Sequence, residues 1–285
     1  MEKINCAIIL AGGVGNRLFP ISNSAKPKQF LNLYGNKTMI QYTYDRINKI
    51  IEKDKIFIVT LDEYKSILKE QIPGLSDKNI ITEPQRKNTA PCILLSLLYI
   101  RTLYNDANII VLPSDHRILN LEKFNNALKL AFESLKNKNE SIIVIGKKPT
   151  RAETGYGYIK YIENNVDNIF EVEKFVEKPS IVLAKKYLNN KLYLWNCGIT
   201  FFDLNYMLGE YNKKANEMYK NFKKLFCEDY NMLSQVYNEC DKISFENAII
   251  EKLNKIYVIK AKFDWDDLGS YESLNKYKDN NNIYV

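Results

Sequence analysis

The sequence predicts an α/β fold with a Rossmann-like, doubly wound and mainly parallel β-sheet. The main observation is that short apolar runs rich in Ile and Val alternate with helix-length amphipathic stretches over residues 1–146. This alternation is typical of a parallel sheet with helices on both faces. A chain of 285 residues, 46% of them hydrophobic, can bury the core that such a sheet needs. No repeat or proline-rich linker divides it, so residues 1–285 are predicted to form a single domain.

The elements of the first half follow in order. Buried strands are predicted at residues 7–10, 56–60, 79–82, 109–112 and 142–145. Helices are predicted between them at residues 38–51, 63–70, 89–104 and 121–136.

The second half has a different pattern, with longer alternating runs. Strands are predicted at residues 156–162, 170–177 and 192–202, and helices near residues 181–189, 204–224 and 245–253. Polar composition predicts turns at residues 137–140 and 164–168, and the Asn-rich tail, residues 276–285, is expected to fray. This half is expected to complete the sheet and cover its ligand-binding edge.

Charge and cysteine content disfavour several classes of protein. Lys and Arg number 41 against 34 Asp and Glu, but they are interspersed with acidic residues and form no basic block, which argues against a nucleic-acid partner. No apolar run approaches the ~20 residues that span a bilayer, so no membrane association is predicted. The five cysteines are an odd set without CxxC spacing, which disfavours a disulfide framework or a zinc cluster. Together with a start that is too short and polar for a signal peptide, these features favour a cytoplasmic protein.

A glycine-rich segment, residues 11–18, follows the first predicted strand. Its glycines would let backbone N–H groups approach a phosphate chain without interference from a Cβ atom. These glycines are Gly12, Gly13 and Gly15. The segment lacks the Gly-Lys-Ser/Thr ending of a P-loop, and Leu18 stands where the dinucleotide fingerprint has its third glycine. A tight turn would also use glycines, but the nearby cations Arg17 and Lys28 favour a bound triphosphate.

Two other segments carry candidate ligand-binding groups near predicted strands. Asp115 follows the fourth strand, where a carboxylate can hold Mg²⁺, although a capping Asp explains the position equally well. Residues 83–91 open the helix after the third strand, where free N–H groups favour an electronegative ligand; an ordinary N-capped helix is the alternative.

An acidic segment near the C-terminus and the single histidine are the last candidates for a metal or substrate site. Residues 264–267 carry three carboxylates, which repel one another unless a cation or solvent separates them, so a solvated acidic turn is the alternative to a metal site. His116 is the only histidine, which excludes a multi-His metal site. It is expected to be structural or a minor substrate contact.

Several motifs together resemble those of one family. Residues 12–20 with 26–30 are similar to the signature of sugar-nucleotide pyrophosphorylases, most closely of bacterial mannose-1-phosphate guanylyltransferases. Residues 83–91 resemble the family's Glu-Pro-x-x-(Arg/Lys)-Asn-Thr-Ala-Pro. Residues 265–271 resemble its Trp-x-Asp-x-Gly-Ser-Trp, with Tyr271 as the final aromatic residue.

Shorter family motifs lie between these, at residues 153–158, 175–179 and 195–198, and the resemblance extends from residue 7 to about residue 274. Family members often continue into a C-terminal β-helical piece or a fused isomerase domain, and neither is expected within residues 1–285. The resemblance therefore leaves the oligomeric state open, and a homodimer is compatible with it.

The resemblance implies a nucleotidyltransferase with a GT-A-like fold, in which a nucleotide-binding half, residues 1–146, precedes a sugar-phosphate-binding half, residues 147–285. It implies that Arg17, Lys28 and Asp115 are catalytic, with the two cations on the triphosphate, and that Asp115 and Asp267 hold Mg²⁺. The implied base-pocket residues are Glu83, Lys87, Asn88 and Thr89. The implied sugar-phosphate contacts are Gly155, Glu177, Lys178 and Asn196. Glu246 stands where the family usually has Asp and receives no role.

The implied reaction is transfer of a guanylyl group. A phosphate oxygen of mannose-1-phosphate would attack the α-phosphorus of GTP in line, giving GDP-mannose and pyrophosphate. Two alternatives stay open: the same chemistry with another nucleoside triphosphate or another hexose- or heptose-1-phosphate, and a non-catalytic sugar-nucleotide sensor on this fold. The presence of both candidate metal aspartates and both triphosphate cations disfavours the sensor.

Overall fold

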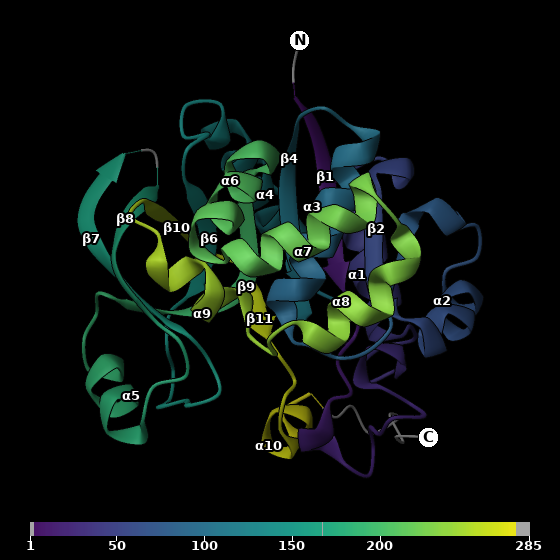
Figure 1. Ribbon diagram of the computed structural model, residues 1–285. Helices are drawn as coiled ribbons and strands as arrows, with labels where there is room; N and C mark the ends of the chain where they lie inside the picture. Colours follow the sequence, from purple (N-terminus) through teal and green to yellow (C-terminus); the bar gives the residue numbers. More distant parts are fainter. Residues whose placement is uncertain (1–2, 167, 278–285) are drawn as a thin grey trace.

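The computed structural model describes residues 3–166 and 168–277. Within these residues, a nine-stranded sheet of order β3-β2-β1-β4-β9-β6-β10-β8-β7 forms the centre of the molecule (Figure 1). The strands of the first half are β1 (Ile4–Leu10), β2 (Ile56–Leu61), β3 (Ile80–Glu83), β4 (Ala107–Pro113) and β6 (Ile142–Lys147). The helices between them are α1 (Met39–Ile47), α2 (Lys65–Gln71), α3 (Thr89–Leu103) and α4 (Leu121–Leu135). The strands and helices predicted for the first half are thus confirmed, with small shifts at their ends.

Strands β1 to β4 are largely apolar because both faces of the sheet are covered. In β1, Ala7 and Ile9 belong to the core cluster that contains α1, α2 and α4, whereas Cys6 and Ile8 belong to the cluster that contains α3 and α6. Successive side chains of a strand point to opposite faces, so burial on both faces removes the polar alternation. Figure 1 shows α3, α6 and α7 in front of the sheet.

The second half adds strands on the β4 side of the sheet and most of the front helices. Its strands are β7 (Tyr158–Val166), β8 (Ile169–Val176), β9 (Tyr193–Asp203) and β10 (Ile256–Lys260). Its helices are α5 (Ile181–Leu188), α6 (Leu204–Lys214), α7 (Asn216–Cys227), α8 (Leu233–Glu239), α9 (Phe245–Ala248) and α10 (Tyr271–Asn275). Strand β9 runs antiparallel between β4 and β6, with Thr200 opposite both Val111 and Val144. The mainly parallel arrangement therefore describes the first half, and the second half adds antiparallel pairs.

Several predicted boundaries in the second half are wrong. The helix predicted at residues 204–224 is two helices, because Ala215 adopts φ −137° and ψ 52°, outside the helical region. The helix predicted at residues 245–253 is the short α9 followed by a 3-10 turn at Ile250–Lys252. The turn predicted at residues 164–168 begins too early, since β7 continues to Val166; residue 167 lies outside the described residues.

The sequence also failed to predict β10 and a separate two-stranded ribbon, formed by β5 (Arg117–Leu119) and β11 (Asp264–Asp266). Because β5 follows β4 in the chain, its pairing with β11 places the acidic segment, residues 264–267, near the end of β4. The fraying predicted for the tail concerns mostly residues 278–285, which lie outside the described residues. In residues 3–166 and 168–277, none of the helices has the length and apolar character needed to cross a bilayer.

Candidate active site

Two aspartates that are far apart in the sequence meet beside the glycine-rich loop. Asp115 lies just after β4 and Asp267 just after β11. The ammonium of Lys28 lies 2.7 Å from Oδ2 of Asp115 and also donates a hydrogen bond to the backbone carbonyl of Asp267. One lysine therefore joins both residues at the carboxyl edge of the parallel strands, where ligands bind in open α/β sheets.

Lys28 differs from the accessible lysine that a triphosphate-binding role suggests, because it is only 4% exposed. Its stem packs against Gly15, which has φ 79°, and a Cβ atom at Gly15 would lie 2.6 Å from the Cβ of Lys28. Any side chain at Gly15 would therefore be strained by its backbone and would displace the lysine. The glycine-rich loop and Lys28 form one packed unit.

The charge of Lys28 acts on Asp115. Burial raises the pKa of Asp115, but the Lys28 ammonium and the adjacent His116 outweigh it and hold that pKa below its usual range. The carboxyl of Asp115 is therefore ionised at neutral pH.

The carboxylate of Asp267 divides its two oxygens between the fold and the site. Oδ1 accepts hydrogen bonds from the Tyr156 hydroxyl at 2.5 Å and from the Gly269 N–H at 2.9 Å. Oδ2 lies 3.9 Å from a guanidinium nitrogen of Arg17, whose side chain is 64% exposed. Arg17 is thus the accessible cation of this group.

The donor set suits a hard divalent cation that is shared with phosphates. The described residues contain no cluster of three or more His, Cys, Asp or Glu side chains that could hold a metal alone. Mg²⁺ typically binds through one or two carboxylates and completes its octahedron with substrate phosphates and water. Asp115 and Asp267 fit that pattern.

Among the residues implied for the base pocket, Glu83 differs from the other three. Its buried carboxylate accepts a hydrogen bond from the Tyr237 hydroxyl through Oε1 at 3.0 Å. Its Oε2 faces the glycine-rich loop, since a Cβ atom at Gly12 would lie 3.3 Å from it. Burial raises the pKa of Glu83 to about 7, although Tyr237 and Cys92 partly stabilise the ionised form.

The other three residues of this motif make contacts within the fold. Lys87 donates hydrogen bonds to the carbonyls of Asn238 and Cys240 at 3.2 and 2.9 Å. The side chain of Asn88 accepts from the N–H of Thr89, and the Thr89 hydroxyl oxygen accepts from the N–H of Phe245. The motif is therefore fastened to residues 237–245 of the second half.

The residues implied for the sugar phosphate gather around residues 155–157, and one of them, Gly155, lies against Arg17. Glu177 and Lys178 form an ion pair at 2.7 Å. A Cβ atom at Gly157 would lie 2.6 Å from Oε2 of Glu177, and the carbonyl of Gly157 accepts from the N–H of Asn196 at 2.8 Å. A Cβ atom at Gly155 would lie 2.9 Å from the guanidinium of Arg17. Because Gly155 and Gly157 have no side chains, the segment that precedes β7 can approach Arg17 and Glu177 closely.

Glu246, which received no role from the sequence, borders this group. Burial raises the pKa of Glu246 to about 7, and the nearby Glu177 carboxylate adds to the effect. Lys178 has φ 45°, a left-handed conformation that non-glycine residues rarely adopt and that tends to cluster at functional sites.

Sequence reasoning missed Tyr156 and Tyr237, which hold the carboxylates of Asp267 and Glu83. The position of Tyr156 between two glycines of a family motif was a signal, whereas Tyr237 carried none. His116 matches its structural expectation, because its Nδ1 accepts a hydrogen bond from the Trp265 indole at 3.2 Å.

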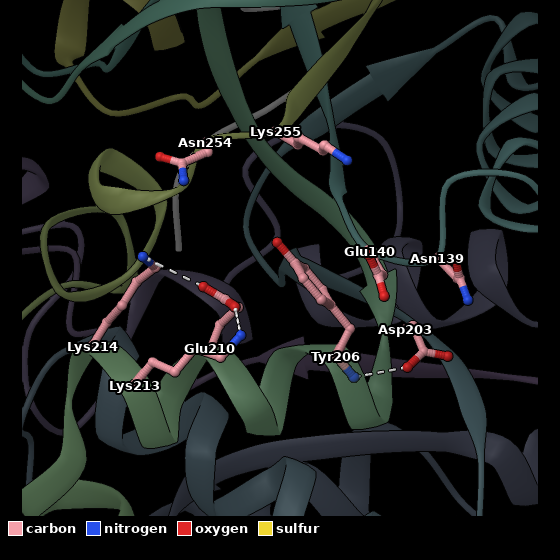
Figure 2. Close-up of a pocket in the computed structure, with 9 residues that line it drawn as sticks. All are labelled: Asn139, Glu140, Asp203, Tyr206, Glu210, Lys213, Lys214, Asn254 and Lys255. Atoms are coloured by element: carbon pink, nitrogen blue, oxygen red, sulfur yellow. Dashed lines mark hydrogen bonds and ion pairs between the residues drawn. The ribbon is translucent and has the colours of Figure 1, made fainter.

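A separate pocket of about 440 Å³ contains none of the predicted site residues (Figure 2). It lies at the opposite edge of the sheet, where β9 ends at Asp203 and α6 begins. Three of its charged residues are paired with one another, since Glu210 accepts from Lys213 at 2.9 Å and lies 3.4 Å from Lys214.

Comparison with known proteins identifies the family of the chain. A family model described as "Nucleotidyl transferase" matches residues 6–282. A curated mannose-1-phosphate guanylyltransferase of Escherichia coli is 32% identical over 283 residues, covering 94% of this chain and 60% of that protein. One from Salmonella montevideo is 34% identical over 281 residues, covering 94% of this chain and 58% of that protein. The chain thus spans about three fifths of the length of these curated relatives.

Solved structures share the fold. A crystal structure from Thermus thermophilus, described as a "mannose-1-phosphate geranyltransferase", superposes with a TM-score of 0.88 at 28% identity, covering 96% of this chain and 80% of that chain. A UDP-glucose pyrophosphorylase complexed with UDP-glucose has a TM-score of 0.61 at 17% identity, covering 97% of each chain, and supports the fold alone. Because the family model matches nearly the whole sequence, the chain belongs to the nucleotidyl transferase family.

Proposed function

We propose that this protein transfers the guanylyl group of GTP to mannose-1-phosphate, giving GDP-mannose and pyrophosphate. The observation that carries the proposal is the meeting of Lys28, Asp115 and Asp267 beside the glycine-rich loop, with Arg17 also against Gly155, two residues before the Gly157 that lies against Glu177. A sensor would need nucleotide contacts but not this combination of carboxylates and cations between two phosphate sites. The names of the curated relatives support the same substrates.

In the proposed reaction the chain positions two anions that repel each other. Arg17 and Lys28 would neutralise charge on the departing pyrophosphate, and Lys178 would hold the phosphate of the sugar close to the α-phosphorus. A divalent cation, for which we propose Mg²⁺, would be held by Asp115 and Asp267 and would neutralise phosphate charge when bound. No side chain needs to remove a proton, because the attacking phosphate oxygen is already ionised.

We further propose that Glu83 recognises the base. When ionised, its carboxylate offers only acceptors, and the Watson–Crick edge of guanine presents two adjacent donors, N1–H and the 2-amino group. The Tyr237 hydroxyl uses part of the hydrogen-bonding capacity of Oε1, whereas Oε2 faces the glycine-rich loop and would accept from the base. The division into a nucleotide-binding half and a sugar-phosphate-binding half is then approximate, because Asp267 and Tyr237 of residues 147–285 would serve the nucleotide.

The substrates can be tested with a panel of nucleoside triphosphates crossed with sugar-1-phosphates, with pyrophosphate release as the measurement. We expect the highest kcat/KM for GTP with mannose-1-phosphate. A preference for CTP, UTP or dTTP would overturn the guanylyl assignment and spare the reaction class. Binding without any turnover across the whole panel would favour the sensor.

If Glu83 recognises the base, Glu83→Gln should lose activity with GTP. Glutamine replaces one acceptor with a donor that opposes guanine, so we expect kcat/KM for GTP to fall about 30-fold or more, as for loss of a charged hydrogen bond in a buried site. Glu210→Gln, which removes a buried carboxylate in the pocket of Figure 2, is the matched control and should leave kcat/KM unchanged. Equal effects of the two substitutions would remove Glu83 from the base pocket.

The same substitution should stabilise the protein at high pH. The pKa of Glu83 is raised from 4.5 to about 7 on folding, so the folded state binds more protons in this range and its stability falls as pH rises through it. The destabilisation of the folded state by the ionised Glu83 carboxylate is complete above about pH 7 and absent below about pH 4.5. We therefore expect Glu83→Gln to raise the free energy of unfolding by about 1–3 kcal/mol more at pH 8 than at pH 5. Denaturant unfolding at the two pH values measures this, and a pH-independent difference would contradict it.

A further inference from the structure

Tyr156 contacts one of the two candidate metal ligands through its hydroxyl group. It is 7% exposed, and its hydroxyl donates a 2.5 Å hydrogen bond to Oδ1 of Asp267. We propose that Tyr156 is a positioning residue that orients the Asp267 carboxylate for the divalent cation. The inference rests on the proposed function, because it takes Asp267 to be a metal ligand.

The distribution of hydrogen bonds on Asp267 indicates how the orientation is set. Oδ1 accepts from Tyr156 and from the N–H of Gly269, two donors that approach from different segments of the chain. The two bonds fix the rotation of the carboxylate about its Cβ–Cγ bond. Oδ2 is then directed toward Arg17, 3.9 Å away, on the side of the glycine-rich loop. Without the phenol, the Gly269 N–H alone would leave the carboxylate free to turn.

The ring of Tyr156 is itself fixed by its neighbours. Trp195 and Trp265 pack against it edge to face, with centroid distances of 5.2 and 5.3 Å. Arg151 donates a weaker hydrogen bond, at 3.3 Å, to the tyrosine oxygen. A side chain held in this way loses little further entropy when it supports a ligand, which is what a supporting residue of a metal site requires.

Tyr156 also connects the metal carboxylates with the sugar-phosphate residues. Its neighbours in the chain, Gly155 and Gly157, lie against Arg17 and Glu177 respectively. Trp265, which packs on its ring, donates to His116, the residue after Asp115. One short segment therefore contacts the triphosphate cation, the sugar site and the packing behind both aspartates.

Direct measurement of metal binding tests the proposal. Mn²⁺ binding is followed by the EPR signal of the free ion, with GTP present and no sugar phosphate, so that no turnover occurs. We expect Tyr156→Phe to raise the Kd of Mn²⁺ about 10- to 100-fold, the usual effect of removing a group that orients a metal ligand. Raised Mn²⁺ should restore most of its turnover when mannose-1-phosphate is added, a rescue that a purely structural defect would not show.

The matched control is Tyr161→Phe. Tyr161 is 4% exposed, lies on β7 close to Tyr156 in the chain, and donates a 3.2 Å hydrogen bond to the carbonyl of Lys191, away from the aspartates. It should show a similar loss of melting temperature and an unchanged Mn²⁺ Kd. Trp265→Phe leaves the phenol of Tyr156 in place but removes the hydrogen bond from the indole to His116. We expect its Kd for Mn²⁺ to lie between those of the unsubstituted protein and Tyr156→Phe.

The outcomes separate this inference from the proposed function. If Asp267→Asn abolishes Mn²⁺ binding while Tyr156→Phe and Trp265→Phe both bind as the unsubstituted protein does, the positioning role is wrong and the metal assignment survives. If the unsubstituted protein and Asp267→Asn bind Mn²⁺ equally, the metal assignment itself fails, and this inference with it.

Discussion

Asp267→Asn is expected to lower kcat by a factor of about a thousand or more, equivalent to about 4 kcal/mol of transition-state stabilisation. Asparagine keeps the shape of the side chain, and its Oδ1 can still accept from Tyr156 and Gly269. It loses the negative charge that would hold the cation between the two phosphates. Steady-state pyrophosphate release at saturating GTP and mannose-1-phosphate measures the loss.

The control for this substitution is Asp264→Asn, at the start of the preceding strand, β11, where the side chain is exposed. It should change neither kcat nor the melting temperature. The melting temperature of Asp267→Asn should stay within a few degrees of the unsubstituted protein. An Asp267→Asn variant with full activity would defeat the metal assignment and the mechanism built on it.

Lys28→Met is expected to lower both stability and turnover. The substitution leaves the Asp115 carboxylate without the ammonium 2.7 Å away. Removing one member of a buried pair costs about 3–5 kcal/mol; because the Asp115 side chain is 30% exposed and partly solvated, we expect about 2–3 kcal/mol. This corresponds to a fall in melting temperature of roughly 4–10 °C. Turnover should fall further than this loss of stability explains, because the leaving pyrophosphate also loses a cation.

Lys26→Met is the matched control, because Lys26 lies two residues away and is exposed. Thermal unfolding and kcat should both be unaffected in this variant. A Lys28→Met protein with an unchanged melting temperature would contradict the buried ion pair. One with unchanged kcat would remove Lys28 from the catalytic group.

Lys28 illustrates what the sequence could not supply. Spacing behind the glycine-rich loop predicts a cation near a phosphate, but it does not reveal that the lysine stem lies beneath Gly15. That burial depends on the register in which two loops pack, which is a tertiary property. The sequence therefore predicts the cation but not its burial in an ion pair.

The first-half elements were predictable because each strand is buried on both faces and reads as a continuous apolar run. Strand β10 was missed because it is five residues long and directly follows a helix and turn. Its place beside β6 is set by long-range pairing, as in Val258 opposite Val144. The contact of Tyr237 with Glu83 likewise joins residues 154 positions apart, and α8, which carries Tyr237, is too short for a helical period to emerge.

The position of β9 in the sheet has a consequence for synthesis of the chain. Strands β4 and β6 leave the ribosome first, and the place between them stays open until residues 193–203 follow. Open strand edges of this kind can pair with other chains, so a nascent chain that ends near residue 146 is exposed to aggregation. Asp267 and Tyr237 emerge later still. Although the glycine-rich loop is among the first segments to be made, the candidate site beside it is complete only after residues 237–267 have followed.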